Sequence, residues 1–259
     1  MSLGLLNRQP TFLSDPAWTT APWEWHPKSV LDWLLDIITQ LPSIFQQTDR
    51  LLLLQPTLSR RREAQGLLRL CIEAESQFEH WLAMVDGQRT PEKPLTYWFE
   101  EMTDPGHAIP FSYTFTFSDS MTGIMFLYNW MAHVLLYKCM ETLDRIISQP
   151  VVDVYPDSWP DAAAADPQIS VARYRQAREM AADICRGLDS ALENALQPDL
   201  LVAPMRVALD LYKEINAASS QDGALEILWL DAFRGRLAEK GQHVATALQG
   251  KQWVQLARF

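Results

Sequence analysis

Hydrophobic residues recur at three- and four-residue spacing over several long stretches of this chain, and that period constrains its fold more than any other feature. The clearest case is ADICRGLDSALENALQPDLLVAPMRVALDLYKEIN, residues 182–216, which reads as two helices separated at Gln197-Pro198. Similar stripes begin at Ser29 and near residues 58, 119 and 221. We therefore expect an all-α protein: a bundle of about six to eight helices, some kinked at proline, with long proline-rich connections.

The helical stripes extend over most of the 259 residues, so we expect a single helical domain over residues 1–259. Residues 1–27 interleave prolines with tryptophans and predict an arm that packs on the body. Residues 149–168 hold four prolines and four aspartates, which predict a flexible acidic loop. Aromatic residues alternate with polar ones over residues 111–117 as in a strand. Since no partner strand is evident, we interpret that segment as extended coil.

Charge and cysteine usage bear on partners and compartment. The formal net charge of −10 and pI of about 4.9 argue against nucleic-acid binding, because affinity for phosphates comes largely from Lys and Arg. The three cysteines are far apart and form no CxxC pair, which fits free thiols in an intracellular, reducing compartment. No signal peptide is recognisable, and the most apolar run, residues 123–137, is shorter than a membrane-spanning helix needs. We expect no membrane association.

Recognisable catalytic motifs do not occur in the sequence. There is no G-x-S-x-G elbow, no glycine-rich phosphate loop and no dinucleotide fingerprint. His80 lacks a Glu three residues before it, and His133 has no carboxylate or cysteine at helical spacing, so neither is expected to hold a metal. The sequence therefore predicts a protein that is not an enzyme, with no catalytic, cofactor-binding or metal-binding residues and no cofactor.

Four segments, in this order and spacing, carry a family resemblance: FLSDPAWTTAPWEWHPKSVLDWLLDII, FSDSMTGIMFLYNWMAHVLLY, MAADICRGLDSALENALQ and LLVAPMRVALDLY. The chain resembles the C-terminal regulatory region of fungal zinc-cluster transcription factors. The most distinctive matching residues are Cys185, Arg186, Pro204 and Arg206, which we interpret as structural. The six-cysteine zinc finger of such factors is missing from this sequence. It is therefore either one part of a longer factor or a finger-less relative, and DNA recognition is not carried by these residues.

The resemblance implies a non-catalytic regulatory and interaction domain in the nucleus, which acts through a protein partner, a homodimer or a small-molecule effector. The alternative is a small-molecule-binding helical protein, or an unusual helical enzyme, with an aromatic-lined pocket between its helices. Four tryptophans on predicted helices are candidates either for that pocket or for an ordinary core: Trp33, Trp81, Trp130 and Trp229.

Overall fold

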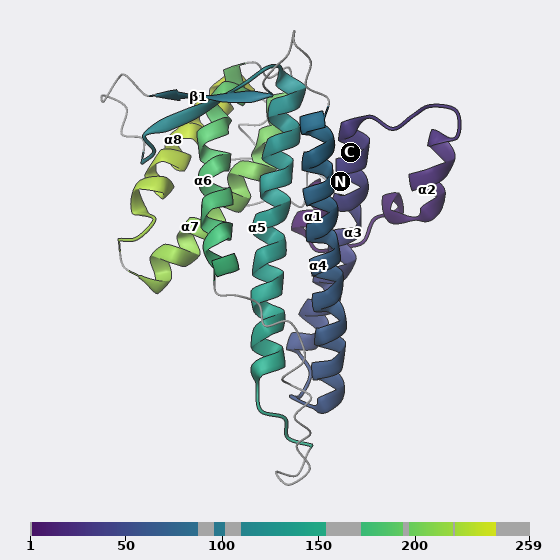
Figure 1. The fold of residues 1–259 in the computed structure, drawn as a ribbon. Helices are drawn as coiled ribbons and strands as arrows, with labels where there is room; N and C mark the ends of the chain where they lie inside the picture. The colour runs from purple at the N-terminus through teal and green to yellow at the C-terminus, as the bar shows by residue number, and fades with distance from the viewer. Residues whose placement is uncertain are drawn as a thin grey trace. The chain divides into compact units, whose positions relative to one another are not determined.

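The computed structural model describes residues 2–87, 96–101, 110–153, 172–193, 197–219 and 221–241. Within these ranges 78% of the residues are helical and eight α-helices form, which confirms the predicted all-α class apart from one two-stranded sheet (Figure 1). The helices are α1 (Ser2–Leu6), α2 (Pro16–Thr20), α3 (Val30–Leu52), α4 (Leu58–Gly87), α5 (Ser120–Ser148), α6 (Ala172–Glu193), α7 (Val202–Ala218) and α8 (Ala224–Lys240), and the strands are β1 (Tyr97–Glu101) and β2 (Tyr113–Phe117).

The chain folds into two compact units, where the sequence predicts one domain. Unit 1 comprises Met1–Met84 and Leu135–Ala177, and unit 2 comprises Val85–Val134 and Arg178–Phe259. Each unit is therefore assembled from two separate stretches of sequence, and the residues of α5 are divided between them.

In unit 1, helix α3 shows how the periodic stripe becomes structure. A capping box begins it: the Ser29 hydroxyl accepts the Asp32 N–H, and the Asp32 carboxylate accepts the Ser29 N–H. Residues that recur every three or four positions are then buried, including Leu34, Ile38 and Leu41. Helix α3 continues without a break through the buried Pro42. The burial of Pro42 and of the α3 residues around it outweighs the loss of the one helical hydrogen bond that a proline cannot donate.

The N-terminal arm packs on α3 through residues other than its tryptophans. Leu5 is fully buried, and Arg8 pairs with Asp49 and lies 5.6 Å from the centroid of the Phe45 ring. Trp18 and Trp25, which we expected to hold the arm, are exposed. Of the predicted flexible loop 149–168, residues 154–168 lie outside the described part of the chain. Asp153 accepts the Leu58 N–H at 2.9 Å, at the start of α4.

In unit 2, the prediction of an extended coil over residues 111–117 is wrong. Strand β2 pairs antiparallel with β1, with Tyr97 opposite Phe117, Phe99 opposite Phe115 and Glu101 opposite Tyr113. The cross-strand rings pack edge to face or at a tilt, for example Tyr97 and Phe115 with centroids 5.2 Å apart. The sheet is stable because these aromatic pairs lie against Phe126 and Trp130 of α5.

Phe117 fills a slot that two glycines create. A Cβ atom on Gly123 of α5 would lie 2.9 Å from Phe117 Cδ2, and one on Gly187 of α6 would lie 2.9 Å from Phe117 Cζ. A larger residue at either position would therefore have to displace the Phe117 ring. The hairpin is thereby held against both helices, and the Phe117 N–H also points to the Ser190 hydroxyl at 3.4 Å.

Candidate binding groove

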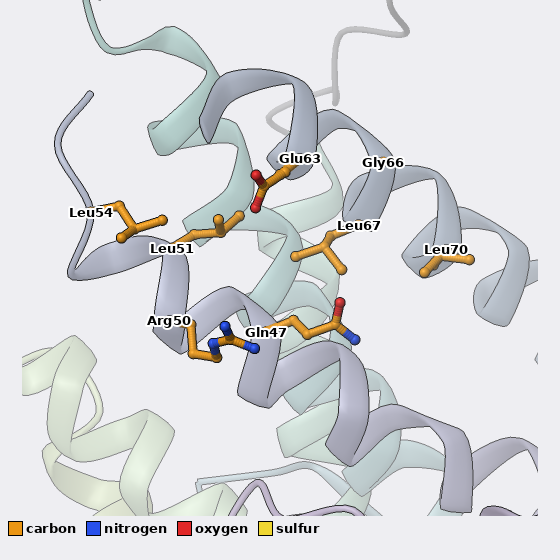
Figure 2. Close-up of a pocket in the computed structure, with 8 residues that line it drawn as sticks. All are labelled: Gln47, Arg50, Leu51, Leu54, Glu63, Gly66, Leu67 and Leu70. Atoms are coloured by element: carbon orange, nitrogen blue, oxygen red, sulfur yellow. The ribbon is translucent and has the colours of Figure 1, made fainter. Parts of the chain in front are cut away.

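An open hollow of about 440 Å³ lies between the end of α3 and the beginning of α4 in unit 1 (Figure 2). Its apolar part consists of leucines from both helices, of which Leu51 and Leu67 are buried. Gly66 leaves one wall of α4 open, since nothing lies within 4 Å of a Cβ built on it. The complete lining is Gln47, Arg50, Leu51, Leu54, Glu63, Gly66, Leu67 and Leu70.

A second hollow of about 310 Å³ continues the first, because Gln47 and Leu70 line both. Its remaining lining is mostly polar: Ser14, Gln40, Ser43, Ile44, Glu73, Ala74 and Gln77. We call the two hollows together the α3–α4 groove. It follows α3 from residue 40 to the end of the helix and continues to residue 54, and it follows α4 from residue 63 to 77, which corresponds to about 21 Å of helix on the α4 wall. That is about four turns of a third helix.

Charges of opposite sign lie on the two walls at the leucine end of the groove. Arg50 projects from α3, and Glu63 projects from α4 toward the side of Leu51 (Figure 2). Both side chains are exposed, and neither makes a hydrogen bond or ion pair with another described residue. Glu73 adds a second carboxylate on the α4 wall at the polar end. The groove thus offers one cation on one wall and two anions on the other.

An apolar lip extends the groove at the end of α3. Leu52, Leu53 and Leu54 are 51%, 87% and 52% exposed, although they follow the buried Leu51. Leu70 on the opposite wall is 44% exposed. Leucines gathered around a hollow in this way mark a surface suited to another apolar surface rather than to water. The signal in the sequence is the run of four leucines, residues 51–54, which is wider than one buried face of a helix requires. Sequence reasoning missed this site.

The four candidate tryptophans are divided between the two units, and none lines the α3–α4 groove. Trp81 is fully buried in unit 1 and donates its indole N–H to the Val30 carbonyl at 2.8 Å. Trp33 is 46% exposed with Lys28 4.7 Å from its ring centroid, so the core interpretation is wrong for this residue. Trp130 and Trp229 are buried in unit 2, in contact with Phe115 and Phe233 respectively.

The residues that carry the family resemblance lie in unit 2. Arg186 pairs with Asp183 at 2.6 Å and covers the ring of Tyr113, with its Cζ 4.5 Å from the centroid. Burial raises the pKa of Asp183, although the hydrogen bond from Arg186 opposes that shift. Arg206 is more exposed and pairs with Asp210, one turn further along α7.

The other two resemblance residues are buried apolar positions. Cys185 is a free thiol whose pKa is raised by burial. Pro204 lies in the first turn of α7, after the 3₁₀ turn Pro198–Leu201, where its missing N–H removes no intrahelical bond. Arg186 and Arg206 thus each pair with a carboxylate on their own helix, α6 or α7.

Across the described ranges, no group of three His, Cys, Asp or Glu side chains comes together in a way that could hold a metal ion. Within the same residues, none of the helices combines the length and the apolar character needed to cross a bilayer.

Comparison with known proteins returned no matching family model, no matching curated protein and no matching solved structure.

Proposed function

We propose that this chain is a non-catalytic regulatory and interaction domain, and that its α3–α4 groove binds an amphipathic helix of a protein partner. The observation that supports this proposal is the groove itself, with its leucine-lined end and its free opposite charges. A groove of this kind fits helix-in-groove recognition, in which apolar side chains at positions i, i+3, i+4 and i+7 enter the groove. The resemblance to the regulatory region of fungal zinc-cluster factors favours the same class of function and a nuclear location.

The chemistry of the two walls defines the partner helix. Leucine-like side chains would fill the end formed by Leu51, Leu54 and Leu67. A carboxylate on one flank of the helix would pair with Arg50, and a Lys or Arg on the other flank would pair with Glu63. Because the groove spans about four turns, a partner segment of about 14 residues would occupy it fully.

A transcription assay tests the regulatory part of the proposal. The chain is fused to a heterologous DNA-binding domain, and reporter expression is compared with that of the DNA-binding domain alone in fungal cells. We expect the fusion to change expression several-fold and Arg50→Glu to remove most of that change. A control variant, Lys213→Glu, alters an exposed cation of α7 outside the groove and should behave like wild type. A fusion that leaves the reporter unchanged contradicts the regulatory function.

A binding assay tests the groove separately. The probe is a designed 14-residue helical peptide with a leucine ridge, glutamates on one flank and lysines on the other. We expect measurable binding by fluorescence anisotropy, and Arg50→Glu or Glu63→Lys should weaken it about 5- to 100-fold. The double variant Arg50→Glu/Glu63→Lys should prefer the peptide with its two flanks exchanged. Equal affinity of wild type and the double variant for both peptides contradicts the assignment of the groove.

A further inference from the structure

Cys71 and Cys139 meet inside unit 1, although 67 residues separate them in the sequence. Cys71 is on α4 and Cys139 on α5, and their thiols are hydrogen-bonded to each other. The Thr48 hydroxyl of α3 joins the pair, with its Oγ1 3.3 Å from Cys139 Sγ. Both sulfurs are fully buried. Three helices therefore contribute side chains to one cluster, which consists of two thiols and a hydroxyl.

The hydrogen bonds of the cluster shift the pKa values of the two thiols in opposite directions. Hydrogen bonds from Cys71 and Thr48 lower the pKa of Cys139. The hydrogen bond with Cys139, together with burial, raises the pKa of Cys71. The Thr48 hydroxyl has a single proton, and it bonds the Ile44 carbonyl at 2.9 Å. It can turn toward Cys139 when that sulfur loses its proton, so the first thiolate of the pair forms at Cys139.

Residues that line the α3–α4 groove lie close to the cluster along α3 and α4. Leu67, which lines the groove, lies one turn before Cys71 on α4, and Gln47, which also lines it, precedes Thr48 on α3. We infer that a small oxidant such as hydrogen peroxide enters past these side chains. Cys185 is equally buried but belongs to unit 2. It therefore serves as an internal control.

We propose that Cys71 and Cys139 form a dithiol site that hydroperoxides convert to an intramolecular disulfide. The Cys139 thiolate attacks one oxygen of hydrogen peroxide, the O–O bond breaks, and a sulfenic acid and hydroxide form. The Cys71 sulfur then attacks the sulfenic sulfur and breaks its S–O bond. The released hydroxide takes the Cys71 proton and leaves as water. Overall the two thiols lose two protons and two electrons, and the peroxide becomes two waters.

The product would join α4 to α5 by an S–S bond of about 2.05 Å, so the two sulfurs must move together from hydrogen-bonding distance. A disulfide closing a loop of this length restricts the unfolded chain. Because Leu67 and Leu70 of the groove are on the same helix as Cys71, oxidation would also fix one wall of the groove.

Peptide mapping tests this proposal on the full chain. The reduced protein is treated with hydrogen peroxide, alkylated and digested with trypsin without reduction. Trypsin places the three cysteines in separate peptides: 70–89, 139–145 and 179–186. We expect a linked 70–89/139–145 peptide that dithiothreitol separates, while peptide 179–186 stays alkylated. Linkage of either peptide to 179–186, or between two chains on a non-reducing gel, overturns the proposal. Cys71 and Cys139 both remaining alkylated at a peroxide dose that oxidises Cys185 also overturns it.

Variants separate the two sulfurs. In Cys71→Ser, the sulfenic acid of Cys139 should persist and react with dimedone, whereas in Cys139→Ser peptide 70–89 should stay alkylated. The reverse pattern overturns the assigned order of attack. Thr48→Val keeps the shape of the side chain and removes its hydroxyl. It should slow disulfide formation roughly 2- to 10-fold, the equivalent of one hydrogen bond, and raise the midpoint of its pH–rate profile. An unchanged profile shows that Thr48 does not assist Cys139.

Discussion

Replacing Gly187 by alanine tests the slot that holds Phe117. Alanine in the interior of a helix is favoured over glycine by about 1 kcal/mol, so a neutral site would gain stability. At position 187 the new Cβ would lie 2.9 Å from Phe117 Cζ and 3.3 Å from Trp130 Cζ3. The Phe117 ring cannot swing aside, since Phe126 stacks on it and Trp130 packs beside it. Overpacking of this kind costs about 1–3 kcal/mol, so Gly187→Ala should be neutral to about 2 kcal/mol destabilising.

Gly235 provides the matched control in the same unit. It lies in the interior of α8, and nothing lies within 4 Å of a Cβ built on it. Gly235→Ala should therefore stabilise the protein by about 0.5–1 kcal/mol. The two alanine variants should differ by about 1–3 kcal/mol in free energy of unfolding, measured by urea titration with circular dichroism.

A double-mutant cycle identifies the cause. If the clash with Phe117 is responsible, Phe117→Leu should lower the cost of Gly187→Ala, with a coupling energy of about 1 kcal/mol or more. Equal stabilisation by Gly187→Ala and Gly235→Ala would show that the ring moves freely, and the account of the slot would then be wrong.

Two further predictions concern one ion pair and two tryptophans. Arg178 donates two hydrogen bonds to Asp222, and these lower the pKa of the Asp222 carboxyl. As the pH falls, the unfolded chain therefore takes up that proton before the folded chain does. The stability advantage of wild type over Asp222→Asn, present at neutral pH, should shrink as the pH falls below the usual pKa of an aspartate; an advantage in urea titrations that does not change with pH contradicts this. Trp81→Phe should lower the free energy of unfolding by about 1–3 kcal/mol, because it loses the Val30 hydrogen bond and leaves a space in the core. Trp33→Phe should change it by no more than about 1 kcal/mol, because Trp33 is half exposed. Equal shifts of the two variants in thermal unfolding would contradict the difference in burial.

Local signals in the sequence were enough to locate the long helices. The stripe that begins near residue 58 became α4, and Gly87, a residue type that favours helix ends, is its last residue. The stretch 119–148 became α5, and α8 ends before Gly241 as its sequence indicates. These predictions succeeded because the burial period and the end signals both act within a few residues.

Features that depend on distant residues were not recoverable in the same way. The alternation in β2 was visible, but its partner β1 is more than ten residues away, beyond a proline-containing connection. The exposed Trp33 and the buried Trp81 belong to equally periodic stripes, and only packing distinguishes them. The contact between Cys71 and Cys139 likewise arises from the packing of α4 against α5, which no spacing rule reveals.

The α3–α4 groove follows from the same apolar stripe that builds the core of unit 1. The stripe on α4 is broad: Leu67 and Cys71 are buried, while Leu70, next to both, is left at an open edge. A groove formed in this way shares side chains with the core, so truncation of Leu67 would weaken folding and binding together. Arg50 and Glu63 are exposed and contribute nothing to the core. Charge reversal at these two positions therefore changes recognition without opening a cavity in the core, which is why the tests of the proposed function use them.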